Sequence, residues 1–174
     1  PGGGDARHGD DAGAGPPAGK SPTLAEWPGF RGPGRNSRVD ATSIETDWNA
    51  FPPELLWKQP VGPGCSSFAI HGDKFYTQEQ RGDLELVSCF NIQTGDLIWK
   101  HEDEARFYDS HAGAGPRATP ALDGDRVYTL GGTGILNALD AGTGELIWSR
   151  HAAEELEIKA LTWGFCASPL VVDE

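Results

Sequence analysis

Three side chains capable of chemistry recur at matching points of the chain. Arg117 follows Cys65 by 52 residues and precedes Cys166 by 49. A thiol acts as a nucleophile only where a base or a cation favours its thiolate, and no base is identifiable beside either cysteine. Arg117 either offers a cation to a ligand or satisfies loop carbonyls, and the second interpretation is favoured. The candidate ligand-facing set comprises Cys65, Ser66, Arg117, Thr119, Trp163 and Cys166.

The histidines and the glycine clusters give weaker signals. His101, His111 and His151 have side chains that can bind a metal or accept a proton. None has a second ligand at a useful spacing, so we expect them to be exposed to solvent and predict no metal site and no catalytic residue. The cluster Gly131–Gly134 lacks the Lys-Ser/Thr of a phosphate loop and is predicted to form a turn. Three scattered cysteines are too few for a disulfide framework.

An internal repeat supplies the elements that position these residues. The segment Ala138–Trp148 (ALDAGTGELIW) has a near-copy in Cys89–Trp99 (CFNIQTGDLIW). A period near 50 residues with β-rich content predicts a β-propeller, because a single four-stranded unit cannot bury both of its faces and must stack on a neighbour. The repeated motif comprises Asn91, Thr94, Gly95, Trp99, Ala138, Asp140, Thr143, Gly144 and Trp148.

The repeated motif is predicted to be structural rather than catalytic. A tryptophan on each outer strand covers the neighbouring blade, and an Asp or Asn with a Thr hydrogen-bonds the turn before it. Glycine in that turn permits close approach. Replacement of Trp148 by alanine is therefore predicted to cost roughly 3–5 kcal/mol of folding free energy in the full-length protein.

Each repeat aligns as four short antiparallel strands, which is one propeller blade. The expected strands are 67–70, 74–77 and 84–91 in the first repeat and 119–122, 126–129 and 135–140 in the second, with a fourth strand carrying Trp99 or Trp148. Residues 55–58 match a fourth strand and are expected to complete the last blade of a closed ring, which removes exposed sheet edges. Residues 168–171 match a first strand, and residues 152–161 are expected to form a short helix.

Composition divides the chain into three regions. Residues 1–26 are rich in Gly, Ala, Pro and Asp and are predicted to be a disordered linker. Residues 27–64 are predicted to be an N-terminal anchor segment with the closing outer strand, in which Arg31 either binds an anion or bonds backbone carbonyls. Residues 65–174 hold the blades, with the first at 65–100, the second at 117–149 and the start of a third at 166–174. The absence of a continuation after that start predicts a truncated ring.

Net charge and hydropathy exclude two classes of partner. The formal net charge of −12 argues against nucleic acid, which requires a basic footprint. No apolar run reaches the roughly 18–20 residues that a membrane span requires, so no transmembrane segment is predicted.

The motif Ala138-x-Asp140-x-x-Thr143-Gly144-x-x-x-Trp148 resembles the tryptophan-docking motif of the pyrroloquinoline-quinone (PQQ) repeat family. That family includes quinoprotein alcohol dehydrogenases and BamB-type outer-membrane assembly lipoproteins. The segment Trp27–Pro33 (WPGFRGP) resembles the start of PQQ-binding-like propeller proteins. The resemblance implies an all-β, eight-bladed ring, of which about two blades and parts of others are present. It also implies export to the cell envelope or periplasm, a monomeric propeller, and protein partners or a small ligand at the rim, where the first strands open on the channel mouth.

The same resemblance raises the question of a cofactor. In the dehydrogenases of the family PQQ lies beside a calcium ion and a pair of adjacent cysteines, whereas no two cysteines are adjacent here. We therefore expect a non-catalytic binding or assembly scaffold without a cofactor. The alternative is a PQQ-dependent quinoprotein dehydrogenase with calcium, whose cofactor residues lie mostly in blades outside this chain.

Overall fold

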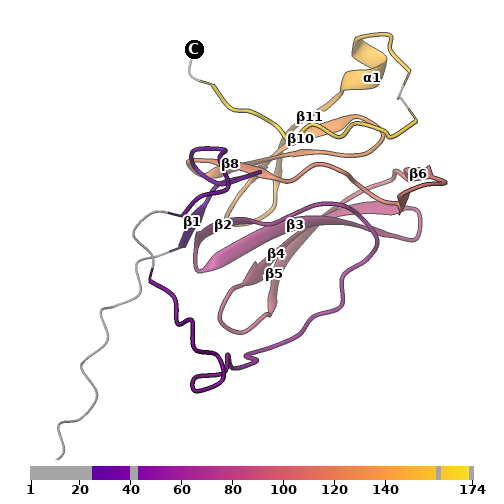
Figure 1. Cartoon of the computed structure of the whole chain (residues 1–174). Helices are drawn as coiled ribbons and strands as arrows, with labels where there is room; N and C mark the ends of the chain where they lie inside the picture. The colour runs from indigo at the N-terminus through magenta and orange to yellow at the C-terminus, as the bar shows by residue number, and fades with distance from the viewer. Residues whose placement is uncertain (1–24, 40–42, 160–161, 173–174) are drawn as a thin grey trace, which may run out of the picture.

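The computed structural model describes residues 25–39, 43–159 and 162–172, which form antiparallel strands and one short helix (Figure 1). The elements are β1 (Ala25–Trp27), β2 (Ala69–Gly72), β3 (Lys74–Arg81), β4 (Leu84–Asn91), β5 (Leu97–Asp103), β6 (Tyr108–Asp109), β7 (Gly113–Ala114), β8 (Ala121–Asp123), β9 (Arg126–Leu130), β10 (Ile135–Asp140), β11 (Leu146–His151) and α1 (Ala152–Glu155). The predicted all-β fold class is confirmed.

Two main sheets correspond to the two sequence repeats. The first has the order β1-β2-β3-β4-β5 and the second the order β8-β9-β10-β11, while β6 and β7 form a separate pair. Hairpins at Gly72 and Gly124 join the first two strands of each repeat, and both glycines have a left-handed φ, of 62° and 53°. The second sheet has the four strands expected of a blade. The first sheet gains a fifth because β1 pairs with the free edge of β2.

The core lies between the two sheets. Strand register places Tyr76, Cys89 and Trp99 side by side across the first sheet, where all three are buried. They pack in one cluster with Val127 and Leu139 of the second sheet, which pair with each other across β9 and β10. Burial of these aromatic and aliphatic side chains is the main contribution to the free energy that holds one blade on the next.

Trp99 makes the most specific contact between the sheets. Its indole Nε1 donates a hydrogen bond to the carbonyl of Ala141 (3.0 Å), and its ring lies directly over Gly144. A Cβ on Gly144 would lie 2.5 Å from the ring, and the φ of Gly144 is +77°. Only glycine therefore permits this contact.

Trp57 makes the same contact on the opposite face of the first sheet. Its Nε1 donates to the carbonyl of Ile92 (3.0 Å), and its ring lies over Gly95 and stacks on Phe75 with a centroid separation of 5.6 Å. Trp148 holds the equivalent position on the second sheet, but 37% of it is exposed among the described residues. Its only aromatic neighbour there is Tyr128, at 6.0 Å.

Several expected boundaries were wrong. The predicted linker lies outside the described residues except for its end, where Ala25 and Glu26 belong to β1. Residues 55–58 and 168–171 form no strand, and the described residues include no other strand of the blades to which they were expected to belong. The helix ends at Glu155, and the left-handed φ of Glu157 (51°) stops it from continuing. Within the described residues, no helix has the length and apolar character needed to cross a membrane.

Candidate functional site

Four loops meet at the end of the sheets marked by β6 in Figure 1. The longest, residues 104–120, joins β5 to β8, and the others are residues 62–66, 131–134 and 162–166. Phe107 joins three of them, because its side chain occupies the space that a Cβ on Gly132 or Gly164 would need. The amide of Phe165 donates to the Gly132 carbonyl (3.1 Å) and that of Cys65 to Pro116 (2.9 Å). These contacts give the loops a fixed arrangement.

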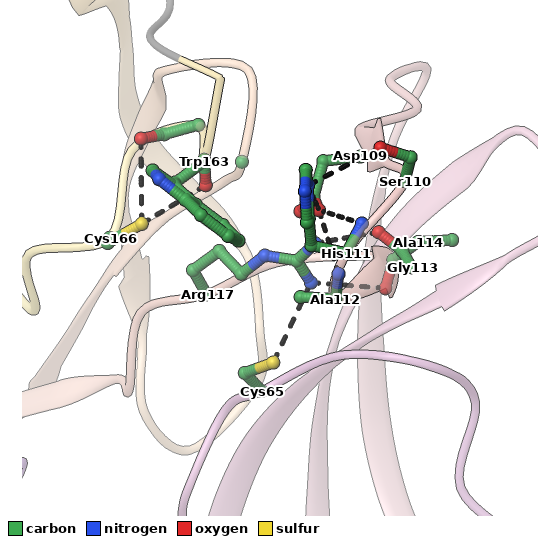
Figure 2. Close-up of polar contacts among 12 residues, drawn as sticks. Cys65, Asp109, Ser110, His111, Ala112, Gly113, Ala114, Arg117, Trp163 and Cys166 are labelled. Carbon is green, nitrogen blue, oxygen red and sulfur yellow. Dashed lines mark hydrogen bonds and ion pairs between the residues drawn. The ribbon is translucent and has the colours of Figure 1, made fainter.

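Arg117 lies at the centre of this loop cluster, and only 9% of it is exposed. Its Nη2 donates to Asp109 Oδ2 and to the Gly113 carbonyl, both at 2.6 Å, and its Nη1 donates to the Ala114 carbonyl at 3.3 Å (Figure 2). Nη1 also lies 3.7 Å from the sulfur of Cys65. A buried guanidinium with these partners acts as a clamp on its own loop.

Asp109 is the counterion that holds this clamp. Its Oδ1 accepts hydrogen bonds from the amides of His111 and Ala112, each at 2.7 Å. The Ala112 amide, the Arg117 guanidinium and the His111 amide lower the pKa of the Asp109 carboxyl below its usual range, because all of them favour the charged form. The Asp109 carboxyl therefore stays ionised at neutral pH and fixes the turn between β6 and β7.

An aromatic surface lies beside the clamp. The ring centroids of His111 and Trp163 lie 5.1 Å apart with the ring planes tilted by 50°, and 50% of Trp163 is exposed. Tyr108, which precedes Asp109 in β6, is 64% exposed. Cys166 is exposed, and its sulfur lies 3.1 Å from the Trp163 carbonyl. Exposed aromatic side chains on a rigid backbone are typical of the residues that contribute most to protein–protein interfaces.

Two predicted members of the site make structural contacts instead, Thr119 between repeats and Ser66 within the first repeat. Thr119 is buried, and its hydroxyl accepts from the amide of Ser67 (3.1 Å) while its own amide donates to the hydroxyl of Ser168 (2.9 Å). These three residues occupy equivalent positions in successive repeats. The hydroxyl of Ser66 bonds the start of the first sheet, accepting from the Gln78 amide (3.3 Å).

Glu85 is a buried carboxyl that the sequence analysis missed. Only 4% of it is exposed, and both of its oxygens lie 3.1 Å from the amide of Gly132 in the second repeat. Burial raises the pKa of Glu85 to about 7, with the Gly132 amide opposing the shift and Asp103 adding to it. A Cβ on Gly131 would clash with the Glu85 carboxylate, so the glycine cluster allows the two repeats to approach closely.

A second polar contact crosses between the sheets nearby. Asn137 on β10 donates to Asp103 Oδ2 on β5 (2.8 Å), and the ring of His101 lies 3.3 Å from the other oxygen of Asp103. The side chain of His101 is only 16% exposed, so the expectation of a solvent-exposed histidine was wrong for this residue. His111 is exposed, and the side chain of His151 is 35% exposed.

The repeated motif forms two equivalent turns, one covered by Trp57 and the other by Trp99. Asn91 Oδ1 accepts from the amide of Thr94 (3.0 Å), and Asp140 Oδ1 accepts from the amide of Thr143 (2.8 Å). The pKa of Asp140 is lowered by the amide and hydroxyl of Thr143. Ala138 and its counterpart Cys89 are fully buried, and burial raises the pKa of the Cys89 thiol, so that this thiol remains protonated and unreactive.

The residues that sequence reasoning missed are Asp109 and Phe107 in a long connection and Glu85 on β4. Asp109, Phe107 and Glu85 surround groups that were recognised, namely Arg117 and the glycine cluster. The available signal for Asp109 was that a buried arginine requires a counterion, and an aspartate lies eight residues before it. No comparable signal marks Glu85, which looks like an ordinary charged residue of an alternating strand.

Two blades of antiparallel strands pack face to face, with a tryptophan of one blade over a glycine turn of the other. This arrangement defines a β-propeller of the PQQ-like repeat class. The chain belongs to the family described as outer membrane protein assembly factor BamB, whose sequence profile matches residues 83–174. A curated relative, the outer membrane protein assembly factor BamB of Yersinia pestis, is 25% identical over 115 residues, which is 62% of this chain and 28% of the relative. The chain thus spans less than a third of that relative's length.

Two solved structures are similar to parts of this chain. The quinohemoprotein alcohol dehydrogenase of Comamonas testosteroni superimposes with a TM-score of 0.54 and 21% identity, over 74% of this chain and 20% of that one. BamB of Moraxella catarrhalis gives a TM-score of 0.33 and 21% identity, over 52% of this chain and 37% of that one. The first of these likenesses shows the fold alone, and it confirms the propeller.

Proposed function

We propose that this chain is part of a cell-envelope propeller that acts as a scaffold for protein partners in outer-membrane assembly. Support comes from the family to which the chain belongs, whose members are described as outer membrane protein assembly factors. The binding surface in this proposal is the aromatic surface of Tyr108, His111 and Trp163. The carrying observation is that the buried Arg117–Asp109 pair fixes the loop that bears Tyr108 and His111, and that Trp163 of the neighbouring loop packs against His111.

Rigidity matters because ordering side chains on binding costs free energy. Each flexible side chain that becomes fixed costs roughly 0.5–1.5 kcal/mol, so a loop ordered before binding retains more of its contact energy. His111 takes its backbone geometry from Asp109, and its ring is placed against Trp163 at 5.1 Å. The preorganised aromatic surface fits an apolar or extended peptide segment of a partner protein.

Site-directed replacement with co-purification tests the proposal. The variant Tyr108→Ser/Trp163→Ser is expected to lose co-purification with outer-membrane assembly proteins from native membranes. Trp48 and Phe51 are 61% and 65% exposed and lie outside the loop cluster, so Trp48→Ser/Phe51→Ser is the matched control and should retain the partner. Equal retention by both variants would contradict a role for this surface.

A quinone cofactor does not fit the residues that this chain contributes. The adjacent cysteines of the dehydrogenases have no counterpart, since Cys65 is followed by Ser66 and Cys166 by Ala167. The terminal nitrogens of Arg117 are already bonded to Asp109, Gly113 and Ala114, so this cation is occupied by its own loop. Dye-linked oxidation of an alcohol by the full-length protein, dependent on added PQQ and calcium, would contradict the scaffold proposal.

A further inference from the structure

A second charged feature lies in the segment Phe30–Val39, which we call the arginine loop. It holds Arg31, Arg35 and Arg38 within eight residues, in a chain whose net charge is −12. All three arginines are exposed. Among residues 25–39, 43–159 and 162–172, no carboxylate forms an ion pair with any of them, although other exposed arginines such as Arg106 and Arg150 have such partners. The loop is therefore a local positive surface on an acidic protein.

The arginine loop lies on the inner edges of the sheets. β1 brings the chain onto the free edge of β2, and the amide of Leu122 in β8 then donates to the Pro28 carbonyl (2.7 Å). Arg35 Nη1 reaches the carbonyl of Pro169 at the start of the third repeat (3.4 Å). The loop therefore lies beside the first strand of the second blade. Figure 1 shows this segment in indigo beside β8, at the opposite end from β6.

The backbone of the loop is fixed in an uncommon conformation. Arg31, Arg35 and Ser37 have left-handed φ angles of 67°, 49° and 62°. Such a conformation is unfavourable for a non-glycine residue, and residues of this kind cluster at ligand-binding positions. Hydrogen bonds from the Ser37 amide to the Arg31 carbonyl and from Arg31 Nε to the Ser37 hydroxyl hold the turn at 2.9 and 3.0 Å. The guanidinium groups thus project from an ordered backbone.

Two hollows adjoin the loop and present its arginines. One of about 410 Å³ is bordered by Phe30, Arg35 and Asp123, and the other, of about 300 Å³, by Glu26, Trp27 and Arg38. Each has the size of a site for a small ligand or a headgroup. The Nη atoms of Arg31 and all the side-chain nitrogens of Arg38 form no hydrogen bond with the described residues, so they can bind a ligand without breaking an internal contact.

We propose that the arginine loop binds a phosphate group, carried either by a free solute or by the headgroup of an anionic lipid. The planar guanidinium fork matches the oxygens of a phosphate in pairs, and several such cations favour a multiply charged anion over a single carboxylate. This site is separate from the aromatic surface of Tyr108, His111 and Trp163, and its failure would leave the partner-binding proposal intact.

Binding measurements on the full chain test this assignment. Pyrophosphate titration by calorimetry probes the free anion, and co-sedimentation with phosphatidylglycerol vesicles, against phosphatidylcholine vesicles, probes the headgroup. We expect Arg31→Gln/Arg35→Gln/Arg38→Gln to weaken binding to at least one probe by tenfold or more. The control Arg106→Gln/Arg126→Gln/Arg150→Gln removes the same charge elsewhere and should change binding less than twofold.

The pattern of results distinguishes the two sources. Pyrophosphate binding without vesicle binding assigns a free phosphate, and the reverse assigns a lipid headgroup. No binding of either probe to the wild-type chain, or equal losses in both triple variants, would overturn the proposal. If the glutamine variant fails to fold by circular dichroism, the triple lysine variant replaces it. That variant keeps the charge but loses the fork, and unchanged binding by it would also contradict recognition by arginine.

Discussion

Replacement of Trp99 by alanine tests the contact that joins the two blades. Trp99 is 8% exposed, packs with Tyr76 and covers Gly144, so truncation removes most of a buried indole. Truncation of a buried aromatic costs roughly 3–5 kcal/mol. The Ala141 carbonyl keeps a second donor, the Tyr76 hydroxyl at 3.1 Å, so no unsatisfied acceptor adds to this cost. We therefore expect a loss of about 4 kcal/mol in the free energy of unfolding, near the middle of that range.

The matched control is the same substitution at Trp148, the equivalent position of the second repeat. Trp148 is 37% exposed in this chain, so Trp148→Ala should cost less than half as much as Trp99→Ala. The larger loss predicted for Trp148 from the sequence refers to the full-length protein and stays a prediction. Urea unfolding of the 174-residue chain, followed by far-ultraviolet circular dichroism, measures both values. A loss below about 1 kcal/mol for Trp99→Ala, or equal losses at the two sites, would refute the packing argument, given the size expected for a buried aromatic.

Three further predictions concern the contacts around the blade interface. Gly144→Ala should destabilise the chain by more than 1 kcal/mol in the same urea assay, a rough minimum because the new methyl meets the indole and φ is +77°. The raised pKa of Glu85, about 7, means that the folded state binds this proton more tightly than the unfolded chain. Its contribution to stability is therefore present below pH 4.5 and is lost as the pH rises through 7. Glu85→Gln should flatten that part of the profile of melting temperature against pH, and an unchanged slope would count against the assignment. Thr119→Val removes the acceptor for the Ser67 amide and should cost about 1–2 kcal/mol in urea unfolding, whereas a neutral effect would show that this bond is not needed.

The repeat pattern was sufficient to predict the blades. The strands Leu84–Asn91 and Ile135–Asp140 begin and end where the alignment of the two copies placed them. Their boundaries follow from local turn chemistry, in which glycine and Asn or Asp fix each hairpin without reference to distant residues. The strands that the structure extends, such as Lys74–Arg81, are longer because the neighbouring β4 supplies hydrogen bonds over its full length.

The parts that could not be predicted depend on partners far away in the sequence. β1 exists only because the edge of β2, more than 40 residues later, is free to pair with it. Leu55–Lys58 carries the sequence of an outer strand but forms none, since a strand requires a neighbouring sheet edge as well as a pattern. Arg117 was recognised from its position in the repeat, yet its burial depends on Asp109, which has no counterpart in the other repeat.

Hydrogen exchange of the tryptophan indoles tests the central claim that successive blades are joined through these rings. In a ¹⁵N-indole NMR experiment on the chain, the Nε1 protons of Trp57 and Trp99 should exchange slowly, because each is donated to a carbonyl of the blade that it covers. The exposed indole of Trp148 should exchange rapidly. Exchange of Trp99 as fast as that of Trp148 would contradict the account.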